Sequence, residues 1–165
     1  VRAWSKGEKV EIRNPNATRP WQHVLEPLGG YLALGRKLFE GNPELKNQSF
    51  NFGPQTKVNQ SVGELITEMA QYWPGAEWKF EQEIDSSKPE STLLKLNCDK
   101  ALQLLQWDSV LNFSETVQMT GKWYQDFYSQ NPSSTLETTS RQIKEYTELA
   151  AQSNLVWTQG QNQMK

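Results

Sequence analysis

Residues 13–24 gather the side chains of this chain that are best suited to bind a charged ligand. This stretch holds two arginines, two asparagines, a tryptophan and the single histidine, and it links a predicted strand to a predicted helix. Ligands often bind at such junctions, because loop side chains converge there and a helix N-terminus favours anions. Arg19 could hold a pyrophosphate through two parallel hydrogen bonds. A purely structural explanation is also open, in which Arg19 pairs with Glu26 at the surface, Trp21 packs against the helix start and His23 caps it.

Motifs for catalysis are missing from the sequence. It contains no Gly-x-Gly-x-x-Gly, no phosphate loop ending in Gly-Lys-Ser/Thr and no Tyr-x-x-x-Lys pair. One histidine without a nucleophile elbow does not make a serine-hydrolase triad. The single cysteine, Cys98, can form no disulfide within the chain and, with one histidine, no multi-ligand zinc site. We therefore expect no catalytic residue, no cofactor-binding residue and no metal ligand in this chain.

The composition narrows the possible partners. The 165 residues carry 17 Lys and Arg against 19 Asp and Glu, a net charge of −2, which lacks the basic surface that nucleic acids require. No apolar run approaches the roughly 20 residues of a membrane span. We expect neither nucleic acid nor membrane as a partner, and the low cysteine content favours a cytoplasmic setting.

The elements that must position these residues are short strands among longer helices. Alternation and turn formers predict strands at 10–13, 49–52, 78–84 and 93–96. Helical spacing predicts helices at 24–39, after a Ser61–Glu64 capping box, and at 98–106, 114–130 and 135–153. This order indicates an α+β unit, mainly helical, rather than a complete doubly wound sheet. We expect residues 1–130 to form the binding portion and residues 131–165 a surface helix with a frayed tail.

The run of residues 12–31, IRNPNATRPWQHVLEPLGGY, closely resembles the CDP-glucose 4,6-dehydratases, members of the extended short-chain dehydrogenase/reductase family of α/β proteins. Further similar stretches follow in the same order, and the resemblance extends over about residues 1–128. They are FNFGP at 50–54, VGEL at 62–65, LKLNCDKA at 94–101 and QW at 106–107. The resemblance implies that this chain corresponds to the C-terminal substrate-binding lobe, without the N-terminal Rossmann domain that binds NAD.

In that family, NAD takes a hydride from glucose C4, water leaves across C5 and C6, and the hydride returns to C6. The resemblance therefore implies an enzyme that acts on a CDP-sugar and feeds the synthesis of deoxy- or dideoxyhexoses for a surface polysaccharide such as the O-antigen of lipopolysaccharide. It also implies a homo-oligomer for the full-length protein. Because the glycine fingerprint and the Tyr-x-x-x-Lys pair are absent here, we expect this chain alone to be inactive.

The resemblance also implies the substrate-binding residues. Arg19 matches the arginine that contacts the nucleotide phosphates, and Asn51 matches the asparagine of the aromatic-Asn-aromatic-Gly strand that faces the nucleotide. Trp21 and His23 match the Arg-Pro-Trp-Gln-His signature, in which they either wall the nucleotide pocket or support Arg19. Glu90 lies in the loop that usually reads Pro-His-Glu-Ala in these enzymes, although the histidine is replaced here.

Two alternatives remain open at this point. A nucleotide-sugar epimerase or reductase of the same family would share the scaffold but not the reaction. A carbohydrate-binding module without catalysis would instead use Trp21, Trp78 or Trp107 as a flat platform for a sugar. If the chain is one lobe of a larger enzyme, we expect apolar surface at residues 1–4, at Val10 and Ile12 and along the helix at 24–39 to be left partly uncovered.

Overall fold

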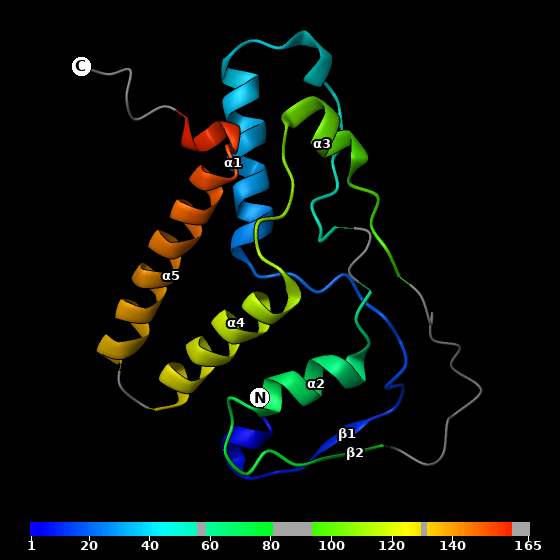
Figure 1. The fold of residues 1–165 in the computed structure, drawn as a ribbon, viewed down its shortest axis with the longest axis vertical. Coiled ribbons are helices and arrows are strands. Elements are labelled where there is room, and N and C mark those ends of the chain that lie inside the picture. Colours follow the sequence, from blue (N-terminus) through cyan, green and yellow to red (C-terminus); the bar gives the residue numbers. More distant parts are fainter. Residues whose placement is uncertain (56–58, 81–93, 130–131, 160–165) are drawn as a thin grey trace.

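The computed structural model describes residues 1–55, 59–80, 94–129 and 132–159, and in these ranges the fold is mainly helical (Figure 1). Two short strands form one sheet, β1 (Val10–Ile12) and β2 (Trp78–Phe80). The helices are α1 (Leu25–Phe39), α2 (Val62–Ala70), α3 (Asp99–Leu105), α4 (Phe113–Tyr128) and α5 (Pro132–Gln152). Three 3₁₀ turns complete the order, η1 (Trp4–Lys6), η2 (Pro43–Leu45) and η3 (Val156–Thr158).

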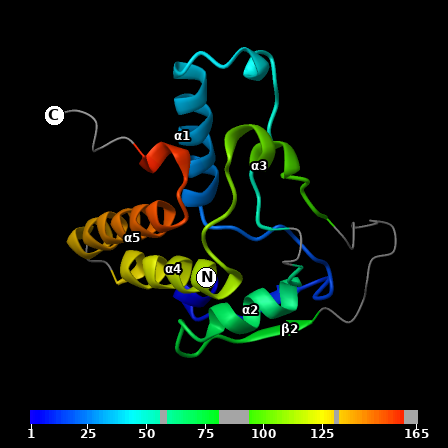
Figure 2. The same ribbon diagram turned by 45° about the horizontal axis from the view of Figure 1, so that its top comes forward.

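The two strands run parallel, with Val10 opposite Trp78 and Ile12 opposite Phe80. Their alternate residues differ in polarity, and Lys79 Nζ pairs with Glu11 Oε1 at 2.7 Å on neighbouring strands. Helix α2 lies alongside this pair, as two views of the ribbon agree (Figures 1 and 2). The strands expected near 10–13 and 78–84 are confirmed in the described residues.

Two helices begin with complete capping boxes. Ser61 Oγ accepts a hydrogen bond from Glu64 N, while the Glu64 carboxylate accepts one from Ser61 N. Asn112 and Glu115 form the same reciprocal pair at the start of α4. These bonds satisfy backbone N–H groups that the first turn of a helix leaves unpaired, which is why the Ser61 pattern predicts a helix start from sequence alone.

The main core lies between α1, α3, α5 and η3. Trp107 is completely buried and packs edge-on against Phe52, with ring centroids 4.9 Å apart. Helix α5 contributes side chains at four-residue spacing, and all of them are buried: Thr138, Gln142, Tyr146 and Ala150. The helix expected at 135–153 as a surface element is therefore amphipathic, and it begins three residues earlier, with Pro132 in its first turn.

Two strand predictions are wrong. Residues 49–52 and 94–96 have no regular secondary structure and belong to no sheet in the described part of the chain. Phe50 and Phe52 instead turn their rings toward the core cluster, so aromatic content that favours a strand serves packing here.

The expected uncovered apolar surface is found only in part. Helix α1 leaves Tyr31, Leu32 and Phe39 exposed, the last of them by 91%, whereas Trp4 and Ile12 are buried. The indole of Trp4 donates a hydrogen bond to Glu77 O at 2.9 Å, which fixes it beneath the turn before β2.

Candidate functional site

The loop of residues 13–24 is held in place by the segment that precedes α2. Val62 N donates to Ala17 O at 2.9 Å, Gly63 N donates to Pro15 O at 2.8 Å, and Thr18 forms an antiparallel bridge with Ser61. Gly63 permits this approach, because an added Cβ would lie 3.3 Å from the Pro15 carbonyl oxygen. The loop therefore has a fixed backbone although it contains no regular secondary structure.

Arg19 and Trp21 both lie on this fixed backbone and are half-buried. One guanidinium nitrogen of Arg19, Nη1, donates to Thr18 O at 2.8 Å. The indole Nε1 of Trp21 donates to Gln60 O at 3.0 Å, which ties the loop to residues 59–62 a second time. Trp21 thus anchors the stretch that carries Arg19.

Asn51 comes from a different part of the sequence but lies on an adjoining segment. Gln22 Nε2 donates to Phe52 O at 3.0 Å, which joins the Arg19 loop to residues 50–54. Phe52 is buried in the core, whereas Asn51 beside it is exposed and donates from Nδ2 to Asn97 O at 3.2 Å. The structure therefore brings the segments of two predicted binding residues together through a contact that spans 30 residues.

His23 stands at the start of α1 and is only 6% exposed. Its Nδ1 accepts a hydrogen bond from Leu25 N at 3.3 Å, and burial lowers the pKa of the imidazole. The ring is therefore neutral near pH 7, with its proton assigned to Nε2. Capping of the helix start, one of the expected roles, is what this geometry performs.

Glu26 is a buried carboxylate, so the structural explanation in which it pairs with Arg19 at the surface is wrong. Its exposure is 1%. Oε1 accepts from Val110 N at 2.9 Å and from Leu111 N at 2.6 Å, and Oε2 accepts from Tyr146 Oη at 3.0 Å. Burial raises the pKa of Glu26, while these hydrogen bonds act in the opposite direction.

A sequence signal for this burial does exist. Glu26, Gly29, Gly30 and Ala33 share one helical face, and all four are buried. A carboxylate on a stripe of small residues must face a closely packed neighbour, which here is Tyr146. Burial also raises the pKa of the Tyr146 phenol strongly, and the adjacent carboxylate adds to that effect.

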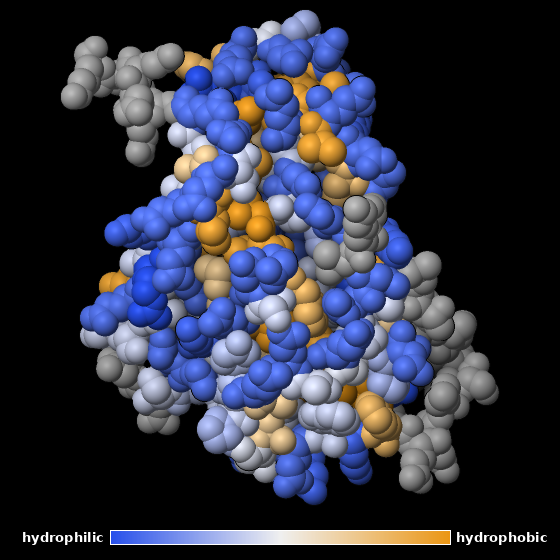
Figure 3. Space-filling view, viewed as in Figure 1, coloured by the Kyte–Doolittle hydropathy of each residue, from blue (hydrophilic) through white to orange (hydrophobic). Residues whose placement is uncertain are grey.

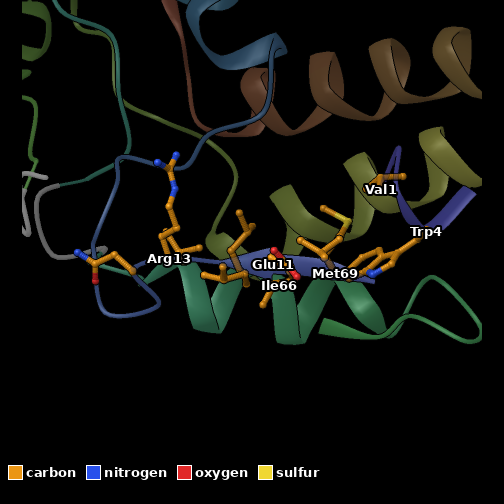
Figure 4. A pocket seen from close by; sticks show the side chains of 11 residues that line it. Val1, Trp4, Glu11, Arg13, Ile66 and Met69 are labelled. Carbon is orange, nitrogen blue, oxygen red and sulfur yellow. The ribbon is translucent and has the colours of Figure 1, made fainter. Parts of the chain in front are cut away.

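Three hollows lie close to these segments. The largest of the three, about 690 Å³, is lined partly by Asn16, Ser61 and Trp78. Another, of about 430 Å³, opens between η1, β1 and α2; Figure 4 shows Trp4 and Met69 at one end and Arg13 at the other. A smaller one, of about 190 Å³, lies next to the Asn51 segment and is lined partly by Pro54, Cys98 and Asp108. None of the three is lined by Arg19 or Asn51.

Part of a known enzyme is similar in sequence to this chain. No protein-family model matches the chain. A CDP-glucose 4,6-dehydratase of Salmonella typhimurium is 34% identical to it over 125 residues, which is 75% of this chain. The chain is a partial relative of that dehydratase. It spans about a third of the relative's length, 34%, so the match is to part of an enzyme. The resemblance drawn from residues 12–31 is thereby confirmed.

Glu90 lies outside the described residues. Within the described ranges, no group of three or more His, Cys, Asp or Glu side chains could hold a metal ion. In the same part of the chain, no helix is long and apolar enough to span a membrane.

Proposed function

We propose that this protein supplies the nucleotide-sugar-binding part of a CDP-glucose 4,6-dehydratase of the extended short-chain dehydrogenase/reductase family, corresponding to its C-terminal lobe. The observation that carries the proposal is the hydrogen bond from Gln22 to Phe52, because it joins the segment of Arg19 to that of Asn51. A guanidinium and a carboxamide on adjoining segments suit the two ends of a nucleoside diphosphate.

Arg19 supplies the charge in this arrangement. A guanidinium forms strong, charge-assisted hydrogen bonds with phosphate oxygens. Its backbone is fixed by the Thr18–Ser61 bridge and by the Trp21 indole, so little conformational freedom is lost when it binds. In this proposal Arg19 contacts the diphosphate and Trp21 supports it.

Asn51 supplies polar recognition. Its amide group donates to Asn97 O, which orients the side chain. The carbonyl oxygen of an amide so oriented accepts hydrogen bonds from a ribose hydroxyl or from the amino group of cytosine. His23 and Glu90 complete the set of residues implied by the resemblance. His23 would contribute from its position at the start of α1.

This chain does not itself fit NAD. A dinucleotide is usually bound by a glycine-rich turn between a strand and a helix, whereas the connection from β1 to α1 contains no glycine. When bound by another domain, NAD would accept a hydride from the sugar and later return it. We therefore expect the 165-residue chain alone to bind a CDP-sugar without converting it, and the complete enzyme to be a cytoplasmic homo-oligomer that serves the synthesis of surface polysaccharides.

The structure bears differently on the two alternative functions, a related nucleotide-sugar enzyme and a carbohydrate-binding module. An epimerase or reductase of the same family would use the same binding residues, so only the catalytic residues of the remaining domain could separate it from a dehydratase. A carbohydrate-binding module is less well supported, because Trp107 is completely buried and Trp21 is half-buried with its N–H already bonded. Trp107 therefore offers no face for stacking on a sugar, whereas Trp78, the third candidate, is half-buried and lines a hollow next to α2, so this alternative rests mainly on Trp78.

The experiment is a calorimetric titration of the protein with CDP and with cytidine. Arg19→Ala should weaken CDP binding about tenfold or more, as expected for the loss of a charge-assisted hydrogen bond, and should leave cytidine binding nearly unchanged. Arg36→Ala is the matched control, because Arg36 is exposed and pairs with Glu40 on α1. Unchanged affinity for CDP in Arg19→Ala would remove Arg19 from the site, and absence of CDP binding in the wild type would refute the proposal.

A further inference from the structure

Another concave surface lies where the end of the Arg19 loop and the start of α1 meet the helices α4 and α5. It has a volume of about 460 Å³. Apolar and aromatic side chains form most of its wall, including Leu28, Trp123, Tyr124 and Ile143, and no Asp, Glu, Lys or Arg lines it. Figure 3 shows hydrophobic side chains gathered where α1 meets these two helices. We call this surface the α1/α4/α5 groove.

The wall of the groove is held by hydrogen bonds between its own helices. Trp123 Nε1 donates to Thr139 Oγ1 at 2.8 Å, and Gln142 Nε2 donates to Met119 O at 2.6 Å. The Trp123 ring also packs edge-on against Tyr124, with centroids 5.2 Å apart. The groove is therefore preformed, which reduces the entropy lost when a ligand binds.

His23 gives the groove one polar group of defined direction. The residue lines the groove, and only 6% of its surface is exposed. Its Nδ1 is engaged by Leu25 N, which leaves the proton on Nε2. In the described part of the chain this Nε2–H has no hydrogen-bond partner, and it is not among the polar atoms that are sealed off from the surface. A donor held in this way favours an acceptor supplied by a ligand.

We propose that the α1/α4/α5 groove binds an uncharged, ring-shaped small molecule whose acceptor atom receives a hydrogen bond from His23 Nε2. The volume falls within the range of about 300–1,000 Å³ that is typical of small-molecule sites. The absence of cationic side chains from the lining excludes the diphosphate of a nucleotide sugar. The groove shares Gln22 and His23 with the segment proposed for nucleotide binding, but Arg19 and Asn51 do not line it, so loss of CDP binding and loss of binding in the groove can be told apart.

Acetophenone is a suitable probe, because it combines an aromatic ring with one carbonyl acceptor. Titration of the protein with up to about 10 mM acetophenone, followed by nuclear magnetic resonance, should shift the indole N–H of Trp123 and the backbone amides of Leu28 and Ile143 in a saturable way, as expected for the millimolar affinity of a small fragment. Cytidine diphosphate should not shift these signals. No saturable shift at these three positions would overturn the site.

Three variants make the test specific. His23→Asn keeps an acceptor near the position of Nδ1 but removes the Nε2 donor, so it should weaken acetophenone about fivefold to tenfold. Leu28→Trp should fill the groove and abolish binding, whereas Leu32→Trp, one turn further along α1 and outside the lining, should leave it unchanged. Equal affinity in Leu28→Trp and Leu32→Trp would overturn the site even if His23→Asn failed to fold, and equal affinity in a folded His23→Asn would remove His23 from it.

Discussion

The buried contact between Glu26, Tyr146 and Gly29 makes a quantitative prediction. A Cβ added at Gly29 would lie 2.6 Å from Tyr146 Oη, closer than such atoms approach, but 3.4 Å from the nearest ring carbons. Gly29→Ala should therefore displace the hydroxyl from Glu26. Loss of a hydrogen bond to a carboxylate costs about 1.5–3 kcal/mol, and alanine regains about 1 kcal/mol over glycine within a helix. We expect the free energy of unfolding to fall by about 1 kcal/mol.

The effect of Gly29→Ala on the free energy of unfolding should change sign when the Tyr146 hydroxyl is absent. Tyr146→Phe alone should lower the free energy of unfolding by about 1.5–3 kcal/mol, because Glu26 Oε2 loses its partner. In that background, Gly29→Ala meets only ring carbons at ordinary distance and should stabilise the protein by up to about 1 kcal/mol. The coupling energy between the two substitutions is then about 2 kcal/mol, well above the few tenths found for independent sites.

Urea unfolding measures these differences directly. With a denaturant slope of about 2 kcal/mol per molar, a coupling of about 2 kcal/mol separates the transition midpoints by about 1 M. Gly35→Ala is the control, since its added Cβ would meet no atom within 4 Å, and it should stabilise both backgrounds equally. An equal effect of Gly29→Ala in the two backgrounds would show that the hydroxyl is not what it displaces.

Two further predictions concern titration and capping. Burial raises the pKa of Glu26 above its ordinary value of 4.5, so above that pH the folded state still holds a proton that the unfolded state releases. The contribution of Glu26 to the free energy of unfolding should therefore fall as the pH rises from about 4.5 through the folded-state pKa. Glu26→Gln should remove this slope in urea unfolding measured from pH 4 to 8, and an identical slope in both proteins would contradict the assignment. Ser61→Ala should cost about 1 kcal/mol by removing one half of the capping box before α2, whereas Ser49→Ala, at an exposed position, should cost less than about 0.5 kcal/mol in the same assay.

Features set by nearby residues could be predicted from the sequence. The capping box at Ser61 and the helical spacing from Val24 to Phe39 depend on contacts within one or two turns, and both helices are present. The strand at residues 49–52 could not be judged in this way, because a strand needs a partner that the sequence does not specify. Phe52 finds Trp107 and Tyr31 instead of a neighbouring strand.

The candidate site shows the same division between local and distant contacts. The chemistry of Arg19 could be inferred from its loop, but its link to the Asn51 segment depends on Gln22 reaching a carbonyl 30 residues away. A carboxylate in the first turn of a helix is favoured by the helix dipole and is usually exposed, so Glu26 is not predicted to be buried from its own neighbours. Its burial depends on partners 84, 85 and 120 residues further along the chain.

The start of α1 therefore joins three parts of the molecule that are distant in sequence. Trp21 is bonded to the segment before α2, Gln22 to the segment of Asn51, and Glu26 to α5 and the residues before α4. His23 lies among these attachments, with Nδ1 bonded to the helix start and its ring among the residues that line the α1/α4/α5 groove. Because these attachments lie within seven residues of Arg19, its position depends on packing far from its loop, although little regular secondary structure surrounds it.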